Sequence, residues 1–357
     1  MTAPPTPASE PALLEVRDIR VHFPITRGTV FRRTVGNVHA VDGLSLELAT
    51  AETLGLVGES GCGKTTLGRA IVGLVPPTSG TILFRGRPLG AKRTSSDGAA
   101  RSHLQMVFQD PTGSLDPRWR VGASIAEPLR LNHIGTRAER TERVSELLEL
   151  VGLSPGHVSR YPHELSGGQR QRVGLARALA LNPAVIVADE AVSALDVSIR
   201  AQIINLLQQL RDQLKLSYLF IAHDLAVVRH LSDRVAVMYL GQIVEQAGAA
   251  DLYTDARHPY TVSLLSAVPV PDPVAEAKRE RIVLPGDPPN PASPPPGCRF
   301  HTRCWLRTRL GNPERCAVEE PVAQHVSAGH TAACHYVHEV PGQAGLSPVG
   351  PAAEPAS

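Results

Sequence analysis

A glycine-rich segment, Gly58 to Thr66, has the residue types and the spacing of a phosphate-binding loop. Its first eight residues fit the pattern G-x-x-x-x-G-K-[ST], which joins a strand to a helix. The glycines allow the loop to curve so that its N–H groups and the helix N-terminus face one anion. Lys64 would reach the outer phosphates of a triphosphate, and the Thr65 hydroxyl would bind Mg²⁺. The predicted triphosphate site comprises Gly58, Glu59, Ser60, Gly61, Cys62, Gly63, Lys64, Thr65 and Thr66.

Two adjacent acids, Asp189 and Glu190, follow the apolar run 185–188. The first acid is placed to bind magnesium, and the second could polarise the water that attacks the outer phosphate. Either acid alone would be an ordinary residue at the end of a strand. Together with the glycine-rich loop, they indicate nucleotide hydrolysis.

Hydrophobic periodicity predicts the elements that must position these side chains. Alternation between strands and helices favours an α/β fold with a largely parallel sheet covered on both faces. Residues 24–38 are expected to form a loop insertion, because Pro24, Gly28 and Gly36 interrupt the pattern. The predicted strands are 13–23, 44–48, 53–57, 106–108, 185–188 and 218–222, and the predicted helices are 67–74 and 199–214, with 120–180 mostly helical.

The segment Leu165 to Gln169 resembles the signature motif of the ABC ATPase family. A serine followed by two glycines would open a helix whose N-terminus can bind an anion. The residues assigned to this motif are Ser166, Gly167, Gly168 and Gln169.

Four further positions match the family pattern in the same order along the chain. Gln109 resembles the Q-loop glutamine that contacts Mg²⁺, and Asp196 closes a segment similar to the D-loop. His223 resembles the switch histidine that contacts the γ-phosphate. Phe23 is the expected adenine-stacking aromatic, and Phe31 is the alternative.

The resemblance covers about residues 13–338 and implies a P-loop NTPase fold of the ABC ATPase type. This fold has a mixed, mainly parallel sheet, an antiparallel β subdomain and a helical subdomain at about 110–180. Its members pair head to tail, and each ATP lies between the phosphate loop of one domain and the signature of the other. One copy of each motif therefore implies a second ATPase subunit, which is either a copy of this chain or a paralogue. The resemblance also implies that Glu190, His223 and Lys64 are the catalytic residues, and that ATP and Mg²⁺ are the cofactors.

The C-terminal third is similar to the extension of the oligopeptide/dipeptide importers, a subfamily that includes nickel importers. The similarity rests on three segments, 258–261, 264–267 and 297–304, together with 110–118 and the insertion from His22 to Gly43. That insertion is closest to the F-type partner of the paired ATPases. The resemblance implies ATP-driven peptide import with two integral permease subunits and an extracytoplasmic peptide-binding protein. A nickel importer, or a soluble ABC ATPase of DNA repair or translation, remains the alternative.

Four of the five cysteines are clustered near the C-terminus, at Cys298, Cys304, Cys316 and Cys334. Four thiolates can hold a [4Fe–4S] cluster or Zn²⁺, and no C-x-x-C pair marks a usual zinc finger. Some members of the subfamily carry an iron–sulfur cluster in this extension, which favours iron, although free thiols stay possible. Trp305 stands where the subfamily commonly has proline. Mixed ligation is left open by His301, His325, His330 and His335.

Composition adds limits to this interpretation. The formal net charge of +2 gives no indication of a nucleic-acid partner. No apolar run reaches the roughly 18–20 residues of a membrane-spanning helix, and residues 1–11 lack the charge and apolar stretch of a signal peptide. We therefore expect a peripheral protein, held at the cytoplasmic face of the membrane by its permeases. The expected segments are a tail (1–12), the ATPase domain (13–268), a proline-rich linker (269–297), the cysteine-rich extension (298–338) and a second tail (339–357).

Overall fold

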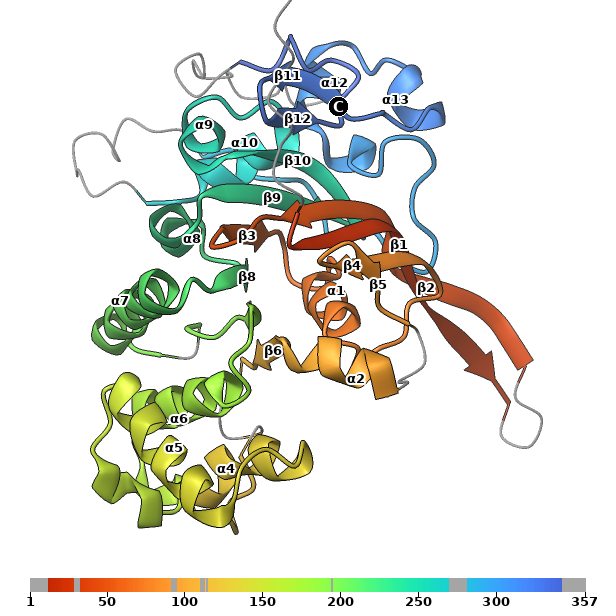
Figure 1. Cartoon of the computed structure of the whole chain (residues 1–357). Helices are drawn as coiled ribbons and strands as arrows, with labels where there is room; N and C mark the ends of the chain where they lie inside the picture. The colour runs from red at the N-terminus through yellow and green to blue at the C-terminus, as the bar shows by residue number, and fades with distance from the viewer. Residues whose placement is uncertain are drawn as a thin grey trace, which may run out of the picture.

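Two β-sheets organise the chain in the computed structural model (Figure 1), which describes residues 12–28, 33–90, 95–109, 113, 115–193, 195–269 and 281–341. The strands are β1 (Leu14–Arg27), β2 (Arg33–Leu48), β3 (Thr53–Val57), β4 (Ser79–Phe84), β5 (Arg87–Pro88), β6 (Leu104–Val107), β7 (Val185–Asp189), β8 (Ser217–Ile221), β9 (Arg234–Tyr239), β10 (Gln242–Gly248), β11 (Gln324–Ser327) and β12 (His330–Ala332). The smaller sheet is antiparallel, in the order β2-β1-β4-β5. The larger sheet has the order β11-β12-β10-β9-β3-β8-β7-β6.

Five neighbouring strands of the larger sheet, from β9 to β6, are parallel. Every residue of β3, β7 and β8 is buried, as expected for strands covered on both faces. Parallel strands present their carboxyl ends at one edge of the sheet. The loops after β3, β6, β7 and β8 therefore begin at that edge, which brings the predicted site residues into one region.

Helices cover both faces of this sheet. The helices of the described residues are α1 (Lys64–Ile71), α2 (Ser95–Ser102), α4 (Val121–Leu131), α5 (Arg137–Leu150), α6 (Gly167–Leu179), α7 (Val197–Leu214), α8 (Leu225–Leu231), α9 (Ala249–Thr254), α10 (Pro259–Ser266), α12 (Trp305–Arg309) and α13 (Arg315–Val318). Alternate residues of β7 face different cores: Val187 packs with α1 and the smaller sheet, and Ile186 packs with α7 and α8. Helices α4, α5 and α6 form the helical lobe at the bottom of Figure 1.

The region predicted as a loop insertion at 24–38 is instead a hairpin where it is described. β1 continues to Arg27 and β2 starts at Arg33, with Phe23 opposite Val38 and Pro24 opposite Asn37. β4 pairs with β1 only as far as Arg20, so the ribbon beyond it has two strands and Pro24 interrupts no central ladder. The ribbon is mostly exposed, which removes the apolar alternation that marks a strand. Residues 29–32, including Phe31, lie outside the described residues.

Other predicted boundaries move by a few residues. The helix expected at 67–74 begins at Lys64, directly after the glycine-rich loop, and ends at Ile71. The strand expected at 106–108 is β6, which ends at Val107. Val340, which the prediction placed in the second tail, is 1% exposed and packs in the core.

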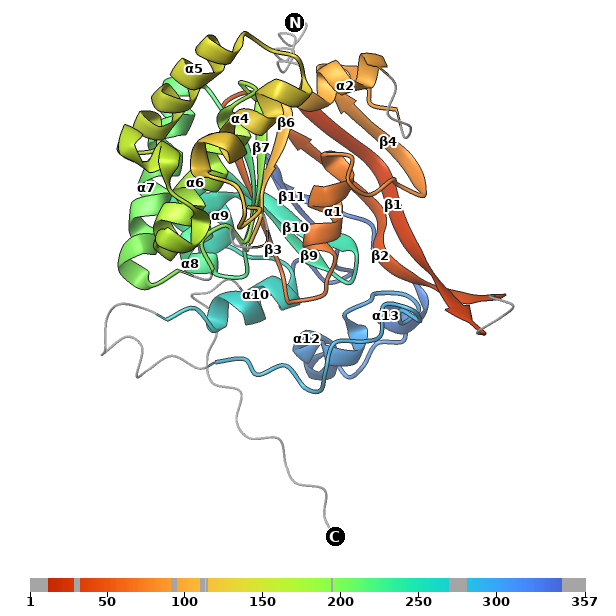
Figure 2. The same cartoon turned by 90° about the horizontal axis from the view of Figure 1, so that it is seen from below.

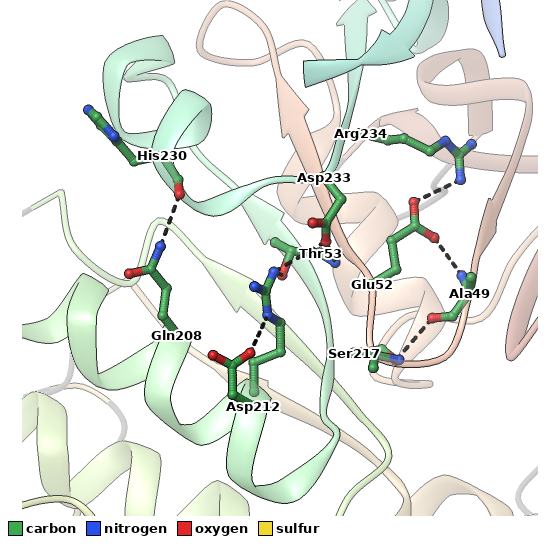
Figure 3. A network of polar contacts seen from close by, with 11 residues as sticks. Ala49, Glu52, Thr53, Gln208, Asp212, Ser217, His230, Asp233 and Arg234 are labelled. Atoms are coloured by element: carbon green, nitrogen blue, oxygen red, sulfur yellow. Dashed lines mark hydrogen bonds and ion pairs between the residues drawn. The ribbon is translucent and has the colours of Figure 1, made fainter. Parts of the chain in front are cut away.

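A polar network joins β3, β8 and α7 at the opposite, amino end of the parallel strands (Figure 3). The Thr53 N–H donates to Asp233 over 2.8 Å, and Arg234 pairs with Glu52 at 2.9 Å. The Ser217 hydroxyl donates to the Ala49 carbonyl over 3.0 Å. These contacts satisfy polar groups at the ends of strands, far from the predicted site, so we assign them a structural role.

The C-terminal segment is built onto the larger sheet. β12 pairs with β10, and the buried Glu245 carboxylate of β10 accepts hydrogen bonds from the backbone of Arg257 and His258. His330 Nε2 of β12 lies 2.8 Å from the same carboxylate. The described proline-rich residues 281–297 form neither helix nor strand, and Pro291 accepts a hydrogen bond from the His39 N–H. Within the described residues, no helix is long and apolar enough to cross a membrane.

Candidate functional site

The glycine-rich loop closes around the Lys64 side chain. Lys64 is 5% exposed, and its Nζ donates to the carbonyls of Gly58 and Glu59 over 2.7 and 3.0 Å. Gly63 caps α1 with φ of +110°, and a Cβ there would lie 1.9 Å from the Ala40 oxygen. This position therefore requires glycine. The result is an ammonium group held inside a loop at a helix N-terminus, which is a binding site for an anion.

Thr65 and Asp189 meet beside this loop. The Thr65 hydroxyl donates to Asp189 Oδ1 over 2.9 Å. Burial raises the pKa of the Asp189 carboxyl, and the hydrogen bond from Thr65 opposes part of that rise. Asp189 is only 3% exposed, so a cation is the natural partner for its charged form. A hydroxyl and a carboxylate in contact are oxygen ligands of the kind that Mg²⁺ prefers.

Glu190 gathers two more of the predicted residues. Its Oε2 accepts a hydrogen bond from Gln109 Nε2 over 2.8 Å and lies 3.5 Å from His223 Nδ1. Glu190 has φ of +45°, a left-handed conformation that is uncommon outside glycine and is frequent at active sites. Its N–H donates to the Ile221 carbonyl at 2.9 Å, which fixes the turn after β7. The structure thus brings Lys64, Thr65, Gln109, Asp189, Glu190 and His223 together at one sheet edge.

The signature residues lie elsewhere, at the N-terminus of α6 in the helical lobe (Figure 1). The Ser166 hydroxyl accepts from the Gln169 N–H over 3.3 Å, and the Gln169 side chain accepts from the Ser166 N–H over 2.9 Å. A Cβ on Gly168 would lie 2.4 Å from Ile199 of α7, whereas Gly167 has only Leu195 within 4 Å. In the part of the chain described, no hydrogen bond or ion pair joins this motif to the glycine-rich loop.

Two other predicted residues, Asp196 and Phe23, stand apart from the assembled group. The Asp196 carboxylate caps α7 by accepting from the Ile199 N–H at 2.9 Å. Phe23 is 41% exposed on the β1–β2 ribbon. Cys62 lies inside the loop, where Lys64 Nζ is 3.7 Å from its Sγ, and burial raises the pKa of its thiol, so it is held as a neutral small side chain.

The second residue of the loop has partners that sequence reasoning missed. The Glu59 N–H donates to the Tyr260 hydroxyl over 2.8 Å, and the Glu59 carboxylate pairs with Arg303. Ser60 and Gly61 are exposed, and Thr66 is half-buried on α1. No local pattern signals this pairing, because Glu59 and Arg303 are 244 residues apart.

The four C-terminal cysteines line one small cavity with His301 and His335. Burial raises the pKa of the Cys298 thiol to about 11 and that of Cys304 to about 12. Among the described residues, the one set of His, Cys, Asp and Glu ligand atoms within 4.8 Å of one another is His22, His39 and Asp42. No three of the four cysteine sulfurs therefore lie within 4.8 Å of one another.

The remaining features of the cysteine region have structural partners. His330 contacts Glu245 rather than this cavity, and His325 is exposed on β11. Trp305, in place of the usual proline, donates from Nε1 to the Pro259 carbonyl over 3.0 Å and to the Ser263 hydroxyl over 3.1 Å. The tryptophan thus anchors α12 on α10.

Comparison with known proteins agrees with this geometry. The family model "ABC transporter" matches residues 41–193, and "Oligopeptide/dipeptide transporter, C-terminal region" matches residues 244–309. The oligopeptide transport ATP-binding protein AppF of Bacillus subtilis is 51% identical over 92% of this chain and 99% of its own length. The oligopeptide transport ATP-binding protein OppF of Escherichia coli is 51% identical over 90% of this chain and 95% of its own.

Solved structures show the same fold. CbiO1 of Clostridium perfringens, part of the ABC transporter complex cbiONQ, gives a TM-score of 0.58 at 26% identity, over 68% of this chain and 91% of its own. An ATP-binding cassette solved as a dimer, bound to ADP and phosphate, gives a TM-score of 0.58 at 26% identity. The match covers 66% of this chain and 98% of that one. The chain therefore belongs to the ATP-binding subunits of ABC transporters, within the oligopeptide/dipeptide transporter subfamily.

Proposed function

We propose that this chain hydrolyses ATP to power ABC-type import of peptides across the cytoplasmic membrane. The observation that carries the proposal is the convergence of Lys64, Thr65, Gln109, Asp189, Glu190 and His223 at the carboxyl edge of the parallel strands. Each has the chemistry that one part of a triphosphate site needs. The relatives named as oligopeptide transport ATP-binding proteins support peptides as the transported substrate.

The mechanism follows from the roles that these side chains can take. The loop and Lys64 would bind the β- and γ-phosphates of ATP. Thr65, Asp189 and Gln109 would hold Mg²⁺, which would supply positive charge beside the phosphates. Glu190 orients the attacking water and accepts its proton, in reach of the Gln109 amide. His223, 54% exposed, contacts the γ-phosphate. Phe23 stacks on the adenine, and Asp196 closes the site from the D-loop.

A complete site requires a second ATPase subunit. The signature at Ser166–Gln169 lies on the helical lobe, away from the chain's own phosphate loop, and its helix N-terminus is free to contact a phosphate across an interface. We propose a paralogous partner in a head-to-tail dimer. Two permease subunits would hold this dimer at the cytoplasmic face, and an extracytoplasmic binding protein would deliver the peptide.

The test is ATP turnover by the assembled transporter as peptide-loaded binding protein is added. We expect turnover to rise with peptide and to vanish in the Lys64→Ala variant. If ATP turnover rises with nickel ions and not with peptide, the transported substrate is nickel and the peptide proposal is wrong. Co-purification with ribosomes or DNA, and not with permeases, would favour the soluble ABC ATPase.

A second proposal concerns the cysteines, which we assign to a [4Fe–4S] cluster in the extension at 298–338. The four thiols line one cavity, and a [4Fe–4S] cluster takes four cysteine sulfurs as its ligands, which supports this assignment. Cys298, Cys304, Cys316 and Cys334 would each supply one sulfur. Iron, sulfide and zinc analysis of anaerobically purified protein tests this: about four irons per chain supports it, and stoichiometric zinc or no metal contradicts it.

A further inference from the structure

The phosphate loop and the C-terminal extension are joined by a partly buried ion pair. Arg303 donates from Nη1 to Glu59 Oε2 over 2.8 Å and from Nη2 to Glu59 Oε1 over 3.3 Å, so the contact is bidentate. Arg303 is 7% exposed, and its Nε donates to the Pro285 carbonyl at 3.2 Å. The guanidinium therefore links the phosphate loop to the extension and to the proline-rich segment before it.

The backbone of Glu59 is held from the same side. Its N–H donates to the Tyr260 hydroxyl over 2.8 Å. The Tyr260 ring packs against Tyr239 and Phe300, with ring centroids 4.7 and 5.4 Å away. In the view of Figure 2, α10 and α12 occupy the same end of the molecule as the start of α1.

These contacts set the direction of the loop at its first bend. Gly58 and Glu59 supply the two carbonyls that accept from Lys64 Nζ. A carboxylate held by Arg303 and an N–H held by Tyr260 leave Glu59 little freedom to rotate. The carbonyl positions on which the lysine depends are therefore determined in part by the extension.

We propose that Arg303 is a positioning residue for ATP hydrolysis, which fixes the phosphate loop through Glu59. The proposal rests on the assignment of residues 58–66 as the triphosphate site. Arg303 acts through Glu59 and not by contact with the phosphates. It acts because a loop held in the binding geometry before ATP arrives loses less freedom on binding, and because a small displacement of Lys64 weakens the contact with the outer phosphates.

The experiment compares ATP turnover by the assembled transporter and binding of a fluorescent ATP analogue by the purified chain. The variants are Arg303→Gln, Glu59→Gln, the double variant and Arg303→Lys. Arg309→Gln is the matched control, because Arg309 is exposed in the adjacent helix α12 and its loss removes the same charge. The variants are compared at equal metal content, and thermal unfolding shows that each one is folded. Glu59→Gln changes no residue of the extension, so it still tests the contact if Arg303→Gln fails to fold.

We expect Arg303→Gln and Glu59→Gln each to lower kcat/KM for ATP about tenfold, the effect of about 1.4 kcal/mol. The double variant should be no worse than either single one, because both changes remove the same contact. Arg303→Lys should recover only part of the loss, since lysine cannot form the bidentate pair. Arg309→Gln should behave as the unmodified chain.

Two results would overturn the inference, and a third would overturn the function beneath it. Additive losses in the double variant would show that the residues act separately. Unchanged kcat/KM in Arg303→Gln, with Lys64→Ala inactive, would leave the triphosphate site intact and refute the positioning role alone. Full ATP binding by Lys64→Ala would instead refute the assignment of the loop.

Discussion

The Gly63→Ala variant tests the geometry of the phosphate loop most sharply. The added Cβ would lie 1.9 Å from the Ala40 oxygen and 2.8 Å from the Met238 Cε, at a φ of +110°. The backbone conformation alone costs a non-glycine residue about 1–3 kcal/mol. The overlap with rigid strand backbone adds about 1–3 kcal/mol, as overpacked cores do. Together they predict a loss of about 2–6 kcal/mol, in stability if the loop holds or in binding if it moves.

Gly61→Ala is the matched control within the same loop. Gly61 also has positive φ, +80°, but no atom lies within 4 Å of an added Cβ. Only the backbone cost remains there, about 1–2 kcal/mol. Urea unfolding without nucleotide gives the stability, and titration with a fluorescent ATP analogue gives the affinity.

The expected result is a clear separation between the two variants. If the loop moves, Gly63→Ala should bind the analogue at least about 30-fold more weakly than the unmodified chain, the equivalent of 2 kcal/mol. The combined loss in the free energies of unfolding and of analogue binding should be smaller for Gly61→Ala than for Gly63→Ala. Equal stability and affinity for the two variants would refute the contact between Gly63 and Ala40 as the reason for glycine.

Three further predictions test other parts of the structure. Ser166→Ala should lower the stability of the chain by about 1 kcal/mol in urea unfolding, because α6 loses its cap, and should reduce turnover of the transporter while leaving ATP binding by the isolated chain unchanged. Cys304→Ser should lower bound iron in metal analysis, whereas Cys62→Ser should retain it; equal iron in both would contradict the proposed ligand set. Glu245→Ala should cost about 3–5 kcal/mol in urea unfolding, because His330 and two backbone N–H groups lose a buried acceptor; a loss below 1 kcal/mol would contradict this.

The chemistry of the nucleotide site was predictable because it lies in local patterns. Gly58 to Thr66 begins after a buried strand, Asp189 ends a second and His223 follows a third, so one edge of a parallel sheet must collect them. The strands themselves were readable because β3, β7 and β8 are continuous apolar runs. Their order in the sheet was not, because nothing local to a strand specifies its neighbours.

The parts that sequence reasoning missed depend on contacts between distant segments. The β1–β2 ribbon is stabilised by backbone pairing and not by burial, so its residues show no apolar alternation. The pairing of Glu59 with Arg303 spans 244 residues and has no local pattern. β12 is three residues long, and its attachment to β10 depends on the buried pair of His330 and Glu245.

The central claim is that this chain hydrolyses ATP with Glu190 as the group that activates water. Its most direct test is single-turnover ATP hydrolysis by the assembled transporter carrying Glu190→Gln, with ATP binding measured in parallel. Glutamine keeps the size of the side chain but loses the base, so we predict unchanged ATP affinity and a rate lowered about 10²–10⁴-fold. An unchanged rate at unchanged affinity would contradict the claim.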